Sequence, residues 1–232
     1  MYSIILPIYN EIENMERLIP EIFETINIDK IEIIVVDDNS IDGSDKVILN
    51  LKKKYESLIY YKRPNQVRSL GKSVEDGIKI SRYQYLILMD SDFSHGLEDL
   101  KEMINIHQKK QLDLICYSRF SNKKPHDFRL RYELSKYYNL ILKPFLNLPT
   151  TDSLSGFFLV NKKKMKDLPN EKIFYGYGDY YFRLLHHINK KQINYEELSF
   201  KWKDRKYGKS KTKFINIFLR YTYEAIKLKL KL

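Results

Sequence analysis

The sequence predicts an α/β fold, because short apolar runs alternate with amphipathic segments along its first half. Apolar runs bounded by turns indicate strands buried on both faces, and a 3.6-residue period indicates helices packed on a sheet. The alternation of strand and helix favours parallel βαβ units. With 232 residues, 43% of them hydrophobic, the chain is long enough for one large domain with a sizeable core.

The first nine elements alternate strand and helix. The run Ile4-Ile5-Leu6, ended by Pro7, indicates the first strand, and apolar residues with helical spacing indicate a helix after it. The run from Ile31 to Val36 indicates the second strand. By the same pattern we expect strands at residues 2–6, 31–36, 58–62, 85–89 and 112–117, and helices at 14–26, 45–55, 71–81 and 97–108.

The second half of the chain is less regular. We expect an aromatic-rich helix at residues 129–142 and a strand at 154–160, interrupted by Gly156. Further elements are a helix at 180–189, a strand at 193–202 and a helix at 214–228. The last helix would place on one apolar face Phe214, Phe218, Tyr221, Ala225 and Leu228. We therefore predict one domain over residues 1–212 and a basic amphipathic helix over 213–232.

Two aspartates after the strand at 85–89 are the most informative residues of the chain. Asp90 and Asp92 stand one residue apart at the carboxyl end of that strand, where open α/β sheets bind ligands. Two such carboxylates would repel each other unless a cation lies between them, and Mg²⁺ and Mn²⁺ prefer oxygen ligands. Because Asp and Ser are also common turn residues, a polar turn is the alternative interpretation.

Polar side chains also follow the first two strands. Tyr9 and Glu11 end the first, and Asp37 and Asp38 begin a polar run after the second. An aromatic ring near carboxylates can stack on a base, while the carboxylates hydrogen-bond the base edge or a ribose. Each motif alone is a weak signal, but three strand ends at one sheet edge together predict a ligand site.

Positive charge is concentrated at the C-terminal end. Residues 201–232 hold eleven Lys or Arg against Asp204 and Glu224, a net charge of +9 within a total of +11. This end could meet lipid, phosphates or nucleic acid, or it could be a solvated lysine-rich helix. The single cysteine, Cys116, excludes an internal disulfide framework, and no apolar run is long enough for a spanning helix. With no signal peptide expected before the first strand, we expect a cytoplasmic protein, or one held at a membrane without crossing it.

Three motifs follow one another along the chain: Pro7-x-Tyr9-Asn10-Glu11, Asp37-Asp38-x-Ser40-x-Asp42-Gly43-Ser44 and Met89-Asp90-x-Asp92-x-Ser94-His95. Other characteristic residues include Arg63, Leu70-Gly71, Ser118-Arg119, Arg131, Ser135, Asp152-x-x-Ser155-Gly156 and Asp204-Arg205-x-x-Gly208-x-Ser210-Lys211. Together they resemble an inverting family-2 glycosyltransferase. Within that family the resemblance is to the polyprenyl-phosphate group that includes dolichyl-phosphate mannose synthase, and it extends from about residue 3 to residue 211.

The resemblance implies a type-A glycosyltransferase fold, with a mostly parallel nucleotide-binding sheet flanked by helices. It implies that the nucleoside of a nucleoside-diphosphate sugar is bound by Pro7, Tyr9, Glu11 and Asp38. It also implies that Mg²⁺ or Mn²⁺ bridges the donor diphosphate, and that its ligands are the catalytic residues Asp90 and Asp92, with Ser94 as a weaker candidate. His95 could touch the diphosphate or support the site from behind.

The resemblance also assigns the phosphate-binding residues. Arg205, a catalytic candidate, and Lys211 would clamp the donor diphosphate from a loop, unless they are only solvated charges. Arg119, Arg131 and Ser135 match positions that contact the acceptor lipid phosphate. A phosphate monoester is already anionic near neutral pH, so that acceptor needs no strong general base.

Departures from the family pattern leave a rival acceptor open. Tyr117 stands in place of the first glycine of Gly-Ser-Arg, and the usual Gly-Gly after Arg119 is missing. A saccharide hydroxyl acceptor would need a base, for which Asp179 is the best-placed acid, although Asp179 could equally cap a helix. A non-catalytic basic module that binds membrane or nucleic acid would not explain acids at three strand ends.

The sequence thus predicts metal-dependent, inverting transfer of a hexose to a polyprenyl phosphate at the cytoplasmic face of a membrane. The expected partners are a nucleoside-diphosphate sugar, polyprenyl phosphate and an anionic membrane surface, but no nucleic acid. A membrane-spanning partner protein is left open. The nucleotide, the sugar and the oligomeric state do not follow from the sequence.

Overall fold

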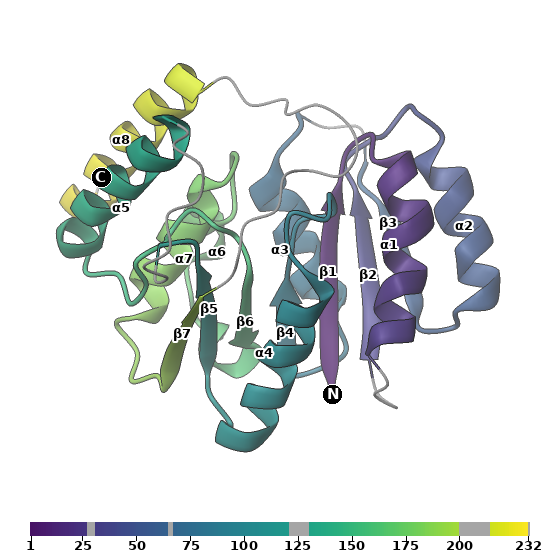
Figure 1. The fold of residues 1–232 in the computed structure, drawn as a ribbon. Coiled ribbons are helices and arrows are strands. Elements are labelled where there is room, and N and C mark those ends of the chain that lie inside the picture. The colour runs from purple at the N-terminus through teal and green to yellow at the C-terminus, as the bar shows by residue number, and fades with distance from the viewer. Residues whose placement is uncertain (27–30, 65–66, 121–129, 200–213, 232) are drawn as a thin grey trace.

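A seven-stranded sheet with helices on both faces forms the described part of the protein (Figure 1). The computed structural model describes residues 1–232 except 27–30, 65–66, 121–129, 200–213 and 232. Its strands are Tyr2–Ile8 (β1), Ile31–Asp37 (β2), Leu58–Lys62 (β3), Tyr85–Leu88 (β4), Leu114–Ser118 (β5), Phe158–Asn161 (β6) and Tyr195–Ser199 (β7). Its helices are Ile12–Thr25 (α1), Ser44–Lys54 (α2), Leu70–Ile80 (α3), Leu97–Lys110 (α4), Leu130–Leu146 (α5), Asn170–Ile173 (α6), Asp179–Ile188 (α7) and Phe214–Leu230 (α8), with a 3₁₀ turn at Lys162–Met165.

The sheet is mostly parallel, which confirms the prediction. The strand order is β3-β2-β1-β4-β6-β5-β7, and only β6 among these strands runs antiparallel to its neighbours. The chain passes from β1 outward to β2 and β3, and then returns to place β4 on the other side of β1. In open α/β sheets, ligands bind at the carboxyl ends of strands where the strand order reverses in this way.

Two apolar cores lie on opposite faces of the sheet. Successive side chains of a strand point to opposite faces. In β1, therefore, Ile4 and Leu6 enter the core beneath α1, α2 and α4, whereas Ile5 enters the core that includes residues of α3, α5, α7 and α8. Both faces of the central strands are thus covered, which explains why these strands are apolar almost throughout.

The sixth strand is shorter than the sequence predicted. A strand was expected at 154–160, but β6 begins only at Phe158. Gly156 has a φ of +70°, and the Ser155 hydroxyl donates to the carbonyl of Tyr117 at 2.9 Å. These interactions hold residues 152–157 as a loop, because a left-handed residue ends the extended conformation.

Helix α8 packs on the domain through three residues of the apolar face predicted for it. Tyr221 and Ala225 are buried in the same core as α7, and Leu228 is partly buried against it. The Tyr221 ring meets that of Phe182 edge to face, with 6.0 Å between centroids. These residues therefore face the domain instead of solvent or lipid, while the boundary at residue 212 stays a prediction. None of the described helices has the length and apolar character needed to cross a membrane.

Replacing Tyr221 with Ala should lower the free energy of unfolding by about 3 kcal/mol, because it empties a packed aromatic site. The matched control is Tyr223→Ala on the same helix, since Tyr223 is 64% exposed whereas Tyr221 is 7% exposed. The control should change stability by about 0.5 kcal/mol or less. Urea unfolding followed by circular dichroism measures both. Equal losses would contradict the packing of α8 on the domain.

Candidate functional site

A cavity of about 270 Å³ opens at the carboxyl ends of β1, β2 and β4. It brings together six residues that the sequence analysis assigned to the nucleoside and the metal: Pro7, Tyr9, Glu11, Asp38, Asp90 and Asp92. Its remaining lining residues are Ile8, Arg68, Ser69, Leu70, Ser73, Ser91, Gly176, Tyr177 and Arg220. The strand order thus joins, in one place, residues from both halves of the chain.

Asp90 and Asp92 lie in the turn that follows β4. The amide of Asp90 donates to Nδ1 of His95 at 3.1 Å, and the amide of Ser94 donates to Oδ1 of Asp92 at 3.0 Å. The His95 ring stacks on Phe157 at 4.5 Å, and burial lowers the pKa of His95 to about 4. A neutral imidazole that accepts at Nδ1 carries its proton on Nε2. His95 is not among the residues that line the cavity, so it supports the turn from behind.

The two aspartates fit a hard divalent ion that is shared with ligand oxygens. Within the described residues, no cluster of three or more His, Cys, Asp or Glu side chains could hold a metal ion alone. Mg²⁺ is commonly bound by one or two carboxylates together with substrate phosphates and water, and Asp90 and Asp92 supply that share. The Ser94 side chain is fully buried and does not line the cavity. Its amide orients Asp92, while its role as a metal ligand stays a prediction.

Asp38 belongs to a buried ion-pair network on the nucleoside side of the cavity. Its Oδ1 pairs with the guanidinium of Arg63, and its Oδ2 accepts from the amide of Ser69 at 2.8 Å. Arg63 also donates through Nε to Asp76 at 3.0 Å. Asp38 therefore joins the end of β2 to the start of α3, and this fixes one wall of the cavity.

Tyr9 lies beneath an arginine that the motif analysis missed. The guanidinium carbon of Arg68 is 3.9 Å from the centroid of the Tyr9 ring. A planar guanidinium stacks on an aromatic face much as a base does. A base that stacks on the same face of Tyr9 would have to displace Arg68. A single arginine in a loop has no spacing signal that would select it from the sequence.

The start of α3 and the loop at 175–178 form another wall. The amide of Gly71 and the hydroxyl of Ser69 both donate to the carbonyl of Gly176, at 3.3 and 3.1 Å. A Cβ atom at Gly71 would lie 2.6 Å from the backbone nitrogen of Tyr175. Only glycine allows the two backbones to approach so closely, which gives a physical reason for the glycine of Ser69-Leu70-Gly71.

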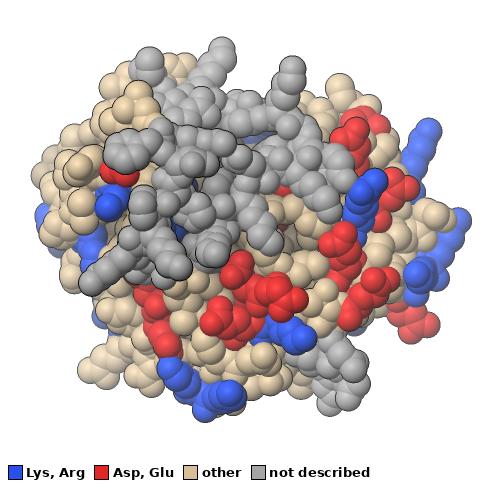
Figure 2. Space-filling model, in the orientation of Figure 1, with Lys and Arg blue, Asp and Glu red and all other residues tan. Residues whose placement is uncertain are grey.

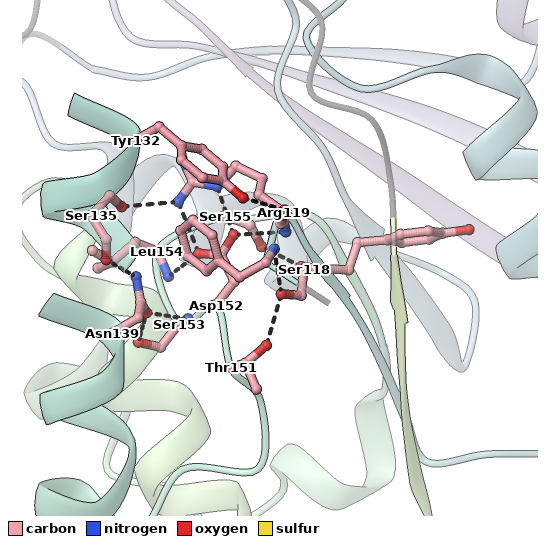
Figure 3. Close-up of polar contacts among 12 residues, drawn as sticks. Ser118, Arg119, Tyr132, Ser135, Asn139, Thr151, Asp152, Ser153, Leu154 and Ser155 are labelled. Carbon is pink, nitrogen blue, oxygen red and sulfur yellow. Dashed lines mark hydrogen bonds and ion pairs between the residues drawn. The ribbon is translucent and has the colours of Figure 1, made fainter. Parts of the chain in front are cut away.

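Arg119 forms an ion pair with Asp152, which is fully buried (Figure 3). Its Nε and Nη2 donate to the two oxygens of Asp152 at 2.6 and 2.8 Å, and Nη2 also donates to the Ser135 hydroxyl at 3.4 Å. Burial lowers the pKa of Arg119, but the charges of Asp152 and Asp90 raise it above its ordinary value. The structure therefore brings Arg119 and Ser135 together, near Asp90. Arg131 lies in the first turn of α5, and its side chain is outside the described part.

Asp179, the predicted base of the rival reaction, is fully buried at the start of α7. Its Oδ1 accepts from the amide of Tyr177 at 2.8 Å, and its Oδ2 accepts from Arg183 at 2.7 Å and from Arg220 at 3.2 Å. It does not line the cavity. Asp179 therefore holds neighbouring groups in place, and this position does not favour contact with a sugar hydroxyl.

Two predicted residues cannot be placed. Arg205 and Lys211, the proposed diphosphate clamp, lie outside the described residues. The cavity instead contains Arg220 and Tyr177, which the sequence analysis did not assign to the site. Helical periodicity does not show which residue of the last helix faces a distant loop, so no pattern in the sequence selects Arg220.

Comparisons with known proteins show the family of the chain. Residues 3–168 match the profile of Glycosyl transferase family 2. Over 235 aligned positions the chain is 29% identical to the dolichol-phosphate mannosyltransferase of Pyrococcus furiosus, covering 97% of this chain and 63% of that protein. Over 113 residues it is 32% identical to the poly(ribitol-phosphate) beta-glucosyltransferase of Bacillus spizizenii, covering 48% of this chain and 18% of that protein. The chain thus spans less than two thirds of either relative.

A solved structure has the same fold. Glucosyl-3-phosphoglycerate synthase from Mycobacterium tuberculosis, in complex with Mg²⁺ and uridine-diphosphate, matches with a TM-score of 0.71 and 15% identity. The match covers 100% of this chain and 78% of that chain. At this level of identity the likeness concerns the fold alone. With the family match over residues 3–168 and the alignment over nearly the whole chain, it follows that the protein belongs to glycosyl transferase family 2 and has the type-A glycosyltransferase fold.

Proposed function

We propose that the protein transfers a hexose from a nucleoside-diphosphate sugar to a polyprenyl phosphate, with inversion at the anomeric carbon. The observation that carries this proposal is that Asp90 and Asp92 share one cavity with Tyr9, Glu11 and Asp38. A paired acid site suits a diphosphate-bound ion, and a ring beside carboxylates suits a nucleoside. Alignment of 97% of the chain with a dolichol-phosphate mannosyltransferase supports the lipid phosphate as acceptor.

In the proposed reaction, an oxygen of the acceptor phosphate attacks the anomeric carbon of the donor sugar. The bond from that carbon to the donor diphosphate breaks at the same time, and its electron pair leaves with the nucleoside diphosphate. Mg²⁺ or Mn²⁺ held by Asp90 and Asp92 would neutralise the charge that builds on the leaving group. Because the amide of Ser94 already orients Asp92 and His95 supports the turn, the acids need little rearrangement to do this.

The acceptor side of the proposal rests on Arg119 and Ser135, which lie beside each other although neither lines the cavity. Asp152 holds the guanidinium in one orientation, and Ser135 lies beside it. Guanidinium groups suit phosphate monoesters because they donate in a fixed fork. An anionic acceptor needs no general base, and the buried position of Asp179 gives no support to the saccharide-hydroxyl alternative.

An exposed apolar surface on α5 and α8 supports a location at a membrane. Figure 1 shows the two helices side by side, and the Tyr138 and Phe218 rings meet at 5.0 Å between them. We call this region the α5–α8 surface. Its exposed apolar residues are Leu130, Leu134, Tyr137, Leu140, Ile141 and Phe145 on α5, and Phe218, Leu219, Tyr223, Ile226 and Leu230 on α8.

The charges near the α5–α8 surface favour an anionic lipid layer as its partner. Basic residues on the two helices include Lys136, Lys143, Lys227 and Lys229. Of their two acidic residues, Glu133 is half-buried in the first turn of α5, and Glu224 is buried and paired with Arg183. In Figure 2 tan side chains border the grey atoms at the upper left, with some blue ones and a red one among them, and acidic side chains gather lower, near the centre of the face. Helices of this kind lie in the headgroup region through apolar burial and attraction to anionic lipid. The proposed location is the cytoplasmic face of a membrane, where a polyprenyl phosphate would be within reach.

Replacing Asp92 with Asn should reduce transfer about 100-fold or more, because charge on the leaving diphosphate is no longer compensated. Binding of Mn²⁺ in the presence of a nucleoside diphosphate, followed by electron paramagnetic resonance, should be lost as well. The control is Asp113→Asn, since Asp113 pairs with Lys164 and does not line the cavity. Full activity of Asp92→Asn with a chelator present would reject the metal site.

Replacing Arg119 with Lys should raise the KM for polyprenyl phosphate about tenfold and leave the KM for the donor nearly unchanged, because lysine cannot supply the fixed fork. The donor is first found by incubating the wild type with UDP- and GDP-sugars and polyprenyl phosphate, and following the glycosylated lipid by mass spectrometry. Arg82→Lys serves as control. Normal use of the lipid by Arg119→Lys, or preference of the wild type for a free sugar hydroxyl, would argue against the acceptor.

The triple variant Ile141→Ser, Leu219→Ser, Ile226→Ser should weaken binding to anionic vesicles about 100-fold or more, since it removes three apolar side chains from the α5–α8 surface. The control variant Ile41→Ser, Leu49→Ser changes exposed apolar residues elsewhere and should bind like the wild type. Vesicle sedimentation measures both. The membrane proposal fails if all three proteins sediment equally, or if the wild type does not bind at low salt.

A further inference from the structure

Arg220 brings the C-terminal helix into the transfer site. Although Arg220 belongs to α8, it lines the same cavity as Asp90 and Asp92. Arg68 and Arg220 are the two cationic residues among the described residues that line this cavity. Arg68 lies over Tyr9, on the nucleoside side, whereas Arg220 lies at the wall formed by Gly176 and Tyr177.

A buried carboxylate holds Arg220 in this position. Its Nε and Nη2 donate to Oδ2 of Asp179 at 3.3 and 3.2 Å, and no further partner is found for the guanidinium among the described residues. Asp179 is fully buried and also pairs with Arg183, so its carboxylate is held in a fixed position. Arg220 is 41% exposed. One edge of the guanidinium is thus fixed to the protein while part of the group stays accessible.

The backbone beneath Arg220 has to be glycine. A Cβ atom at Gly176 would lie 1.6 Å from Nη2 of Arg220, so any side chain there would displace the guanidinium. Gly176 also has a φ of +76°, a conformation that other residues rarely adopt. The carbonyl of the same residue accepts hydrogen bonds from Ser69 and Gly71 at the start of α3. The position of Arg220 is therefore tied to the wall that closes the cavity on the α3 side.

We propose that Arg220 binds a phosphate oxyanion of the reacting molecules, and that Asp179 and Gly176 position it for this task. The inference rests on the proposed function, because that function supplies the phosphate. A guanidinium with one edge held by a carboxylate keeps donors for a phosphate in a fixed direction. The phosphate belongs either to the donor diphosphate or to the acceptor lipid, and the two sources can be separated by experiment.

Titration calorimetry of the full chain with UDP and with GDP, each with Mn²⁺, tests the donor. If the donor phosphates bind Arg220, Arg220→Gln should weaken the affinity for the nucleoside diphosphate about tenfold, a loss of about 1.4 kcal/mol of binding free energy. The affinity for the corresponding nucleoside should stay unchanged. If the acceptor phosphate binds there, diphosphate affinity should stay the same, and the KM for polyprenyl phosphate should rise about tenfold instead. Either result supports the proposal.

The matched control is Arg82→Gln. Arg82 is also an accessible arginine paired with a fully buried carboxylate, Glu32, at 2.7 Å, but it does not line the cavity. Both variants thus remove one such ion pair, and thermal unfolding compares their stability. If Arg220→Gln does not fold, Arg220→Lys keeps a cation beside Asp179 without the planar fork, and the same two measurements apply to it.

Equal values for the Arg220 variants and Arg82→Gln, in both diphosphate affinity and lipid KM, would overturn the proposal while leaving the proposed function intact. A wild type that binds neither diphosphate and glycosylates no polyprenyl phosphate would instead overturn the proposed function, and the role of Arg220 with it.

Discussion

The need to balance buried negative charge at one edge of the sheet governs the rest of the structure. Three of the buried carboxylates near that edge each pair with an arginine from another part of the chain: Asp38 with Arg63, Asp152 with Arg119, and Asp179 with Arg220. A buried carboxylate without such a partner costs several kcal/mol. The loops that carry these residues are therefore held at the sheet edge by their own ion pairs, and the cavity forms between them.

Helix α8 connects the surface and the site. Its outer side contributes Leu219 and Tyr223 to the α5–α8 surface, and its inner side contributes Tyr221 to the core. Glu224 accepts from the hydroxyl of Tyr175, at the loop that also forms the cavity wall. The same helix supplies Arg220 to the cavity. A shift of α8 would thus change the cavity wall as well as the α5–α8 surface.

Sequence reasoning found the parts of the molecule that local patterns determine. The strands β1, β2 and β4 and the acids Asp90 and Asp92 were predicted because apolar runs and strand ends are local signals. The start of β6 was missed because Gly156 and Ser155 make it a loop through contacts with distant residues. On α8, Phe218 was predicted on the same face as the buried Tyr221 and Ala225 but is exposed, because apolar positions surround this helix and only packing shows which of them face the core.

Strand β6 lies between β4 and β5 in the sheet but follows both of them in the sequence. The strands β1 to β4 and the pair β5 and β7 are therefore joined only once β6 has been made. β1, β2, β3 and β4 pair only with one another and with β6, and β5 pairs with β6 and β7. During synthesis, the strands that carry Tyr9, Asp38 and Asp90 at their ends are complete by residue 88, whereas β5 emerges with no partner in that sheet. It joins only after residues 158–161 have followed and inserted between β4 and β5. The strands β1 to β4 can therefore pair first. Strand β5, which leads to Arg119, joins the sheet only after β6 is synthesised about forty residues later.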